Sequence, residues 1–216
     1  MPAIGITGGI STGKTVFCEC LRQIAPGAKF FNADHAARDL AHRDPEVRNE
    51  IAREFGADIY SASGDLNRER VRAIILQSAS KKNALEQILH PRIRRQWSAE
   101  AKTSSSNFFF ADIPLLYETG GETLCDRVVV VACSPDVQLA RLLSRGKVEG
   151  RAPASPRVAS PELRPPIDER TAMQMIRSQM PLEEKIRRAD HVVWNNGDRS
   201  LLAGQAAMLV QLWSAK

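Results

Sequence analysis

The chain has 216 residues, of which 43% are hydrophobic and 25% are charged. This length and composition are typical of one globular domain with its own hydrophobic core, and they exclude collagen-like, low-complexity and intrinsically disordered proteins. The 30 basic and 25 acidic residues give a net charge of +5, and 22 of the basic residues are arginines. Because the planar guanidinium group suits phosphate and carboxylate, one interpretation is a phosphate-rich partner, and a solvated arginine-rich surface is the other.

The sequence carries no signal for export or membrane insertion. No apolar run approaches the length of a membrane span, and the N-terminal residues lack the basic and long apolar segments of a signal peptide. The four cysteines, Cys18, Cys20, Cys125 and Cys133, form no C-x-x-C pair. We therefore expect a cytoplasmic protein with reduced, buried thiols, and no disulfide framework, zinc site or membrane contact.

Short apolar runs alternate with segments of helical periodicity along the chain. Buried strands are predicted at residues 3–7, 29–31, 107–111, 127–132 and 191–194. Helices are predicted over residues 14–25, most of 34–102, 134–145, 168–188 with an interruption at Pro181, and 200–213. Asp44-Pro45 is expected to open one helix, and His90-Pro91 another. This alternation predicts an α/β fold in which a mostly parallel sheet of about five strands is covered by helices on both faces.

Residues 146–167 differ in composition from the rest of the chain. Five of the 12 prolines lie between Pro153 and Pro166. This density of proline favours an irregular, mobile excursion, and we expect no helix within it.

Residues 8–15, with the sequence GGISTGKT, match the phosphate-binding pattern G-x-x-x-x-G-K-S/T between a predicted strand and a predicted helix. Glycines let backbone N–H groups turn inward around phosphates, and the positive end of the following helix points at them. Lys14 would reach the β- and γ-phosphates, and the Thr15 hydroxyl would bind Mg²⁺. The pattern predicts a protein that binds a nucleoside triphosphate. The residues of the loop and of the following helix that are expected to contact the nucleoside triphosphate are Gly9, Ile10, Ser11, Thr12, Gly13, Lys14, Thr15 and Val16.

Phosphate loops of this kind occur in GTPase switches, motors, helicases and small-molecule kinases. A GTPase would carry N-K-x-D after a late strand, whereas residues 195–198 have the sequence NNGD, without a lysine. Motors and helicases are usually larger. A kinase of this size carries an acceptor-binding insertion after the second strand and an arginine-bearing lid late in the chain. The helical block at residues 32–102 and the arginines Arg141 and Arg145 fit that arrangement.

We therefore describe residues 1–216 as a single P-loop kinase domain with three layers, α/β/α. Its core comprises residues 1–31, 103–145 and 189–216. The acceptor-binding insertion comprises residues 32–102, and the lid, with its proline-rich insertion, residues 146–188. Ligand-binding residues are expected beyond the carboxyl ends of the strands.

Further motifs resemble those of the dephospho-CoA kinase family, nearly from end to end. GITGGISTGKT at residues 5–15 resembles the family's GLTGGIGSGKS, and NAD at 32–34, followed by Arg38, resembles D-A-D-x-x-x-R. Residues 84–94 (ALEQILHPRIR) closely match L-E-x-I-L-H-P-x-I-R, and PLLYE at 114–118 resembles P-L-L-F-E. The pattern Q-x-x-R-L-x-x-R at 138–145 and QMPLEEK at 179–185 follow in the family's order. The phosphate loop alone is generic, whereas these blocks together are specific.

The chain departs from the family pattern at a few positions. Asn32 and Asn67 replace aspartates, and Ser11-Thr12 replaces Gly-Ser inside the loop. Met175 stands where the family has an arginine, and residues 146–167 make the lid longer than the family's. These departures concern the phosphate contacts of the lid and not the fold.

The resemblance implies a role for each matching residue. Asp34 would act as the general base or orient the acceptor hydroxyl, and Lys14 and Arg145 would stabilise the transferring phosphoryl group. Arg141 would lie against the adenine ring or a phosphate of the nucleotide, which Asn195 would also contact. The acceptor site would be lined by Asp34, Arg38, His90, Arg94, Leu115 and Glu118, and Mg²⁺ would be held by Thr15 and Asp112.

Each of these residues also has a structural interpretation. Asp34 would cap a helix, Asp112 would cap the end of a strand, and His90 would mark the start of a helix. Arg38, Arg141 and Arg145 would instead form surface ion pairs.

The resemblance implies an ATP-dependent kinase that phosphorylates the ribose 3′-hydroxyl of dephospho-CoA, giving CoA and ADP in the last step of coenzyme A biosynthesis. One alternative is a P-loop kinase for another small acceptor, such as a nucleoside monophosphate. Another is a basic nucleic-acid-binding ATPase. That class would carry an RNP, OB-fold or helix-turn-helix signature, which the sequence lacks, so we expect no nucleic-acid partner. The oligomeric state stays open between a monomer and a small homo-oligomer.

Overall fold

The computed structural model describes residues 2–144 and 167–215. Arg145 and residues 146–166 of the predicted proline-rich segment lie outside this part of the chain. Within it, the strands form one sheet in the order β2-β3-β1-β4-β5, and all neighbouring strands are parallel. The strands are β1 (Ala3–Gly8), β2 (Lys29–Asn32), β3 (Phe109–Asp112), β4 (Arg127–Ala132) and β5 (His191–Trp194). The predicted parallel sheet is confirmed.

Helices connect these strands, as the periodicity predicts, except that a short 3-10 turn lies between β3 and β4. Several begin at a polar side chain that binds free backbone N–H groups: Asp44 accepts from Glu46 N and Val47 N, and Asn67 accepts from Arg70 N. The helices are α1 (Lys14–Ile24), α2 (Ala33–Arg43), α3 (Pro45–Phe55), α4 (Arg68–Gln77), α5 (Ala79–Thr103), α6 (Pro135–Ser144), α7 (Glu169–Arg177), α8 (Leu182–Arg188) and α9 (Arg199–Ser214), with short 3-10 turns at Ala57–Ile59 and Gly121–Leu124.

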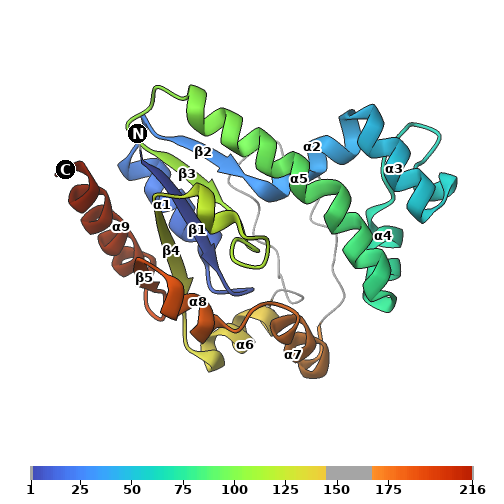
Figure 1. The fold of residues 1–216 in the computed structure, drawn as a ribbon. Helices are drawn as coiled ribbons and strands as arrows, with labels where there is room; N and C mark the ends of the chain where they lie inside the picture. Colours follow the sequence, from blue (N-terminus) through green and yellow to red (C-terminus); the bar gives the residue numbers. More distant parts are fainter. Residues whose placement is uncertain (1, 145–166, 216) are drawn as a thin grey trace.

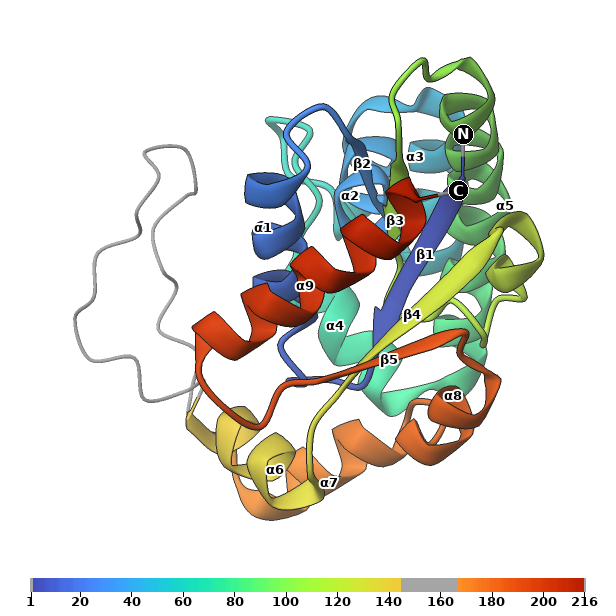
Figure 2. The same cartoon turned by 90° about the vertical axis from the view of Figure 1, so that its left-hand side faces the viewer.

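Helices α1 and α9 cover one face of the sheet (Figure 2). Successive side chains of a strand point to opposite faces, and Ile4 and Ile6 of β1 therefore lie together on this side. They belong to a buried cluster that includes Phe17 of α1 and Trp213 of α9. This packing fixes the start of α1, and so the residues before it, relative to the end of β1.

Helix α5 covers the opposite face, together with α8 and the beginning of α2 (Figure 1). Trp97 of α5 is 1% exposed and packs with Phe31, Phe109 and Val130 of the sheet. The ring planes of Phe31 and Trp97 are inclined by 22°, with their centroids 6.5 Å apart. The sheet is thus the middle of three layers, as predicted.

The helical insertion projects from one side of the sheet (Figure 1). Helices α3, α4 and α5 enclose their own cluster, which includes Val47, Ile51 and Val71. The predicted helix start at His90-Pro91 is wrong, because Pro91 lies inside α5. A proline in a helix interior removes a backbone hydrogen bond. The helix continues because residues before Pro91 pack in the insertion and residues after it pack on the sheet.

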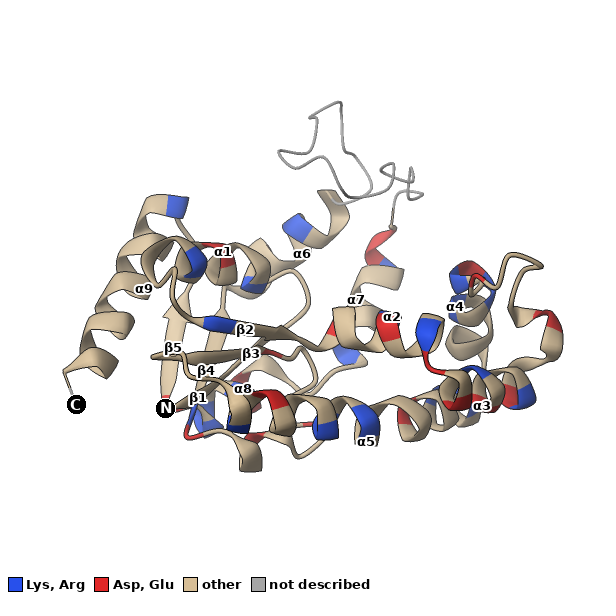
Figure 3. Cartoon of the chain, turned by 90° about the horizontal axis from the view of Figure 1, so that it is seen from above, with Lys and Arg blue, Asp and Glu red and all other residues tan. Residues whose placement is uncertain are grey.

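Basic and acidic side chains are interleaved along the outer helices. Figure 3 shows blue and red positions mixed on α3, α4 and α5. Several of them are paired, as between Arg92 Nη2 and Glu50 Oε1 (2.6 Å) and between Lys81 Nζ and Glu54 Oε1 (2.8 Å). Among the described residues, no helix combines the length and apolar character needed to cross a membrane.

Candidate active site

The phosphate loop joins the end of β1 to the start of α1 at the carboxyl edge of the sheet. Gly13 caps α1 with φ of +92°, a conformation that side chains disfavour. A Cβ atom on Gly13 would lie 2.0 Å from Asn195 Nδ2, which donates to Thr12 O (2.9 Å). Thr12 Oγ1 in turn donates to Gly9 O (2.9 Å). The loop is therefore held from within and by Asn195, whose predicted contact with the nucleotide stays a prediction.

The first turn of α1 is available for an anion. Among the described residues no side chain caps it, and its first turn contains no acidic residue. Uncapped N–H groups and the helix dipole make such an end attractive to phosphate. Thr15 lies in this turn with an exposed side chain, whereas Val16, also predicted to contact the nucleotide, is half-buried and packs with the core.

Ile10 is predicted to contact the nucleotide, but its backbone groups are bonded to other residues of the protein. Its N–H donates to Gln179 Oε1 (3.0 Å), and its carbonyl accepts from Gln138 Nε2 (2.8 Å). Both backbone polar groups of this residue are thus bonded to protein. Ser11, the next residue, has a positive φ of 62° and a buried hydroxyl without a partner in the described part of the chain.

Lys14, Asp112 and Asn32 meet where three neighbouring strands end. The register pairs Asp112 with Ile6 of β1 and with Asn32 of β2. Lys14 Nζ forms an ion pair with Asp112 Oδ1, and Asn32 Nδ2 donates to Asp112 Oδ2 (2.8 Å). Asp112 is 4% exposed. A buried carboxylate that bonds the lysine of the loop is positioned as the predicted metal-binding acid would be.

Asn32 has two functions at this edge. Its Oδ1 accepts from His35 N (2.7 Å) and so caps α2, while its Nδ2 reaches Asp112. The structural interpretation of Asp34 as the cap of this helix is therefore wrong. Asp34 instead lies exposed in the first turn of α2, two positions after Asn32. Arg38 follows it by four positions on the same helix and is also exposed.

Arg141 of α6 approaches the phosphate loop from the other side. Its Nη1 would lie 3.8 Å from a Cβ on Gly13, and this nitrogen is buried without a hydrogen-bond partner in the described residues. Its side chain also bonds Cys133, whose pKa is raised by burial and lowered in part by Arg141. A guanidinium nitrogen left without an acceptor beside the loop fits the predicted contact with a nucleotide. Arg145, its predicted companion, lies outside the described residues.

Two residues predicted to line the acceptor site form bonds that involve the loop after β3. Arg94 donates to Thr119 O (3.2 Å) and Gly120 O (2.9 Å), and so fixes the turn after this strand. Glu118 Oε1 accepts from Met180 N (3.0 Å) and pairs with Lys185 Nζ (2.9 Å). Both side chains thus bond other segments of the protein, and their contact with an acceptor stays a prediction.

His90 and Leu115, which are also predicted to line the acceptor site, are half-buried. His90 lies on α5, and burial lowers its pKa while Glu86 raises it in part. The imidazole is therefore biased toward its neutral form. Leu115 lies in the turn after β3, next to the buried Leu116.

Three polar residues near the loop were given no role from the sequence. Gln138 and Gln179 bond Ile10, and Lys185, which is 0% exposed, donates to Gly8 O (3.3 Å) and Pro114 O (3.0 Å). All three belong to blocks that resemble the kinase family, and that was the one signal that pointed to them.

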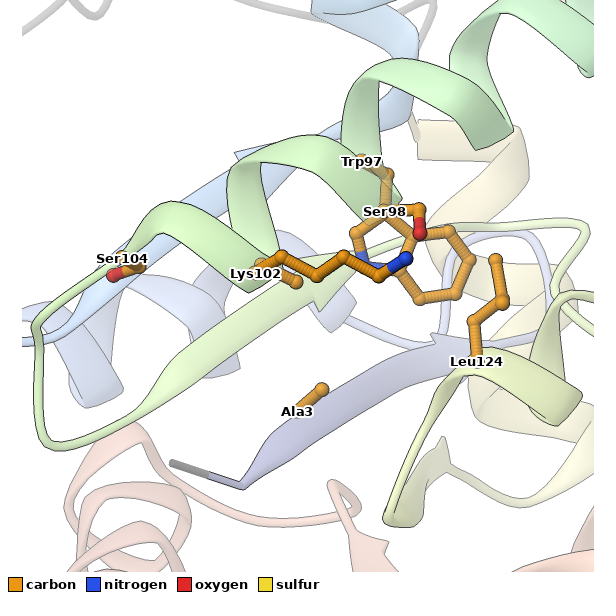
Figure 4. A pocket seen from close by; sticks show the side chains of 7 residues that line it. Ala3, Trp97, Ser98, Lys102, Ser104 and Leu124 are labelled. Atoms are coloured by element: carbon orange, nitrogen blue, oxygen red, sulfur yellow. The ribbon is translucent and has the colours of Figure 1, made fainter.

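A cavity of about 420 Å³ lies away from these residues. It is lined by Ala3, Trp97, Lys102 and Leu124, and Figure 4 shows it beside the beginning of β1. Because the phosphate loop follows the opposite end of that strand, this cavity is not the nucleotide site.

The parallel sheet, the glycine loop that opens a helix, and the lysine beside a strand-end acid define a P-loop phosphotransferase. The family model for dephospho-CoA kinase matches residues 2–200, and the chain belongs to this family. It is thus an ATP-dependent kinase.

Two relatives named dephospho-CoA kinase extend over nearly the whole chain. The protein from Syntrophotalea carbinolica is 36% identical over 97% of this chain and 91% of its own length. That from Anaeromyxobacter dehalogenans is 38% identical with the same coverage. The solved dephospho-CoA kinase from Campylobacter jejuni shares the fold, with a TM-score of 0.64 and 22% identity over 97% of this chain and 95% of its own.

Proposed function

We propose that the protein transfers the γ-phosphoryl group of ATP to the ribose 3′-hydroxyl of dephospho-CoA, giving CoA and ADP. The observation that carries the proposal is the meeting of Lys14, Asp112 and Asn32 at adjacent strand ends, with Asp34 in the first turn of the next helix. A lysine of the phosphate loop and an exposed carboxylate thus belong to one edge of the sheet, where a triphosphate and an alcohol can be brought together.

In the proposed reaction the 3′-oxygen attacks the γ-phosphorus as the bond to the bridging oxygen of ADP breaks. The Asp34 carboxylate accepts the proton of the hydroxyl, and its exposure leaves it accessible to the acceptor. Lys14 exchanges Asp112 for phosphate oxygens and neutralises charge on the phosphoryl group, together with Arg145. Arg141 and Asn195 hold the nucleotide against the start of α1.

Magnesium, when bound with ATP, supplies neutralisation of phosphate charge. Thr15 and Asp112 are the residues that would hold it. Their hydroxyl and carboxylate oxygens are the hard donors that this ion prefers, and it commonly takes few protein ligands beside phosphates and water. The exposed side chain of Thr15 and the position of Asp112 beside Lys14 fit such a site.

We further propose that the acceptor lies between the start of α2 and the loop after β3. Arg38 would bind its phosphate groups, and His90, Arg94, Leu115 and Glu118 would form the wall. Arg94 and Glu118 hold the backbone of this wall through their bonds to Gly120 and Met180.

The four free cysteines, three of them buried, support a location in the reducing cytoplasm.

The test of this function is ADP release from Mg-ATP in the presence of dephospho-CoA, with AMP and a reaction without acceptor run in parallel. Release that requires dephospho-CoA supports the proposal. Release with AMP alone would keep the kinase class and refute the acceptor, and release without any acceptor would indicate an ATPase.

A further inference from the structure

Lys185 is a charged side chain placed entirely inside the protein. It is 0% exposed and lies in α8, far along the chain from the phosphate loop. Its ammonium group pairs with Glu118 Oε1 (2.9 Å) and donates to Pro114 O (3.0 Å) and Gly8 O (3.3 Å). A buried ammonium group is strongly destabilising unless it is paired and hydrogen-bonded, so these contacts must be kept for the fold to tolerate it.

The three acceptors match the three N–H bonds of a lysine ammonium group. No donor is left for a phosphate oxygen, and the reaction as proposed above does not use Lys185. Its contacts join separate segments of the chain. Gly8 ends β1 and is the first residue of the phosphate loop, and Pro114 follows the strand that carries Asp112. Thr7 Oγ1 also donates to Pro114 O (2.9 Å), which ties the same two strand ends together.

The segment that carries Lys185 reaches the phosphate loop at a second point. Gln179 Oε1 accepts from Ile10 N (3.0 Å), and Met180 N donates to the same Glu118 oxygen that pairs with Lys185 (3.0 Å). Residues 179–185 therefore hold the loop at Gly8 and at Ile10, on either side of Gly9.

We propose that Lys185 is a positioning residue for the phosphate loop. Through Gly8 and Pro114 it sets the position of the loop relative to the strand that ends at Asp112, and Gln179 completes the same support at Ile10. This inference rests on the proposed function only where it concerns turnover. The effect of Lys185 on nucleotide binding can be measured without an acceptor.

The test uses Lys185→Met, which removes the charge and keeps a long side chain, and Gln179→Ala, which removes one contact at a half-buried position. Lys102→Met, on the exposed side of α5, is the matched control. ADP affinity is measured by calorimetry, and KM for dephospho-CoA by steady-state kinetics. Because small displacements of catalytic groups are costly, we expect ADP affinity to fall about tenfold or more in Lys185→Met and about threefold or more in Gln179→Ala. KM for dephospho-CoA should stay within about twofold.

A double variant, Lys185→Met with Glu118→Leu, separates positioning from stability. Lys185→Met leaves the Glu118 carboxylate without its cationic partner, whereas the double variant removes both charges, so it should regain part of the Tm lost in Lys185→Met. Its ADP affinity should nevertheless stay low, because the contact with Gly8 is still missing. If affinity recovers together with Tm, the role is structural only and the proposal is overturned.

The remaining outcomes are also decisive. Unchanged ADP affinity in Gln179→Ala overturns the proposal even if Lys185→Met fails to fold. The proposal is also overturned if the only effect of these substitutions is a higher KM for dephospho-CoA. If the wild-type protein binds ADP but does not phosphorylate dephospho-CoA, the proposed function fails while the positioning claim is still judged by calorimetry.

Discussion

Replacing Gly13 by alanine tests how the phosphate loop is held. The residue has φ of +92°, and a Cβ atom would lie 2.0 Å from Asn195 Nδ2. The left-handed conformation costs a side-chain-bearing residue about 1–2 kcal/mol. Asn195 is buried, and moving its amide aside breaks its bond to Thr12 O, a loss of about 1 kcal/mol. We therefore expect Gly13→Ala to lower the free energy of unfolding by about 2–3 kcal/mol.

Urea denaturation of the wild type, Gly13→Ala, Asn195→Ala and the double variant measures this loss. Asn195→Ala removes the bond to Thr12 at a cost of about 1 kcal/mol. Because Gly13→Ala already breaks this bond, adding Asn195→Ala to it should lower the free energy of unfolding little further. ADP affinity should also fall about tenfold in Gly13→Ala, since the loop relieves its strain by moving the amides at the start of α1.

Additive effects would refute this reasoning. If the two substitutions sum to within about 0.5 kcal/mol, the amide of Asn195 is not displaced by a side chain at Gly13. A Gly13→Ala protein with unchanged stability and ADP affinity would show that the loop is not constrained as the structure has it.

Two further predictions concern the acceptor and the buried thiols. Asp34→Asn should lower kcat about a hundredfold or more with KM for ATP little changed, because in the proposed reaction this exposed carboxylate accepts the proton of the acceptor hydroxyl. Steady-state kinetics would contradict this if kcat stayed near the wild-type value. Burial raises the pKa of Cys18 and of Cys125 to about 12, and between about pH 9 and 12 the unfolded chain loses thiol protons that the folded chain keeps. The free energy of unfolding should therefore fall as the pH rises above about 9, by up to about 1.4 kcal/mol per pH unit for each thiol. Urea titrations at several pH values should show a smaller slope in Cys125→Ala. An equal slope in the variant would contradict the raised pKa of Cys125.

The sheet and its loop could be predicted because their signals are local. The apolar runs at each strand are short and bounded by turns, and the pattern around Lys14 requires a strand before it and a helix after it. Pro91 was misinterpreted because the continuation of α5 depends on two separate clusters, in the insertion and on the sheet, that support the helix on either side of it.

The support of the site could not be predicted from local patterns. Asn32 differs from the family's aspartate, yet it caps α2 and bonds Asp112, a pairing that only the register of β2 and β3 reveals. Lys185 stands among charged residues in a helix that would be expected to face solvent, and its burial depends on acceptors from distant segments. The roles of Arg94 and Glu118 in holding loop backbone depend on contacts of the same kind.

The most direct test of the central claim follows the phosphoryl group itself. The protein is mixed with dephospho-CoA and Mg-ATP labelled in the γ-phosphoryl group, and the product is identified by mass spectrometry and by phosphorus NMR. Label in the 3′-phosphate of CoA, in equal amount to ADP and lost in Asp34→Asn, is the predicted result. Label in inorganic phosphate, or in CoA at an undiminished rate in Asp34→Asn, would contradict the account.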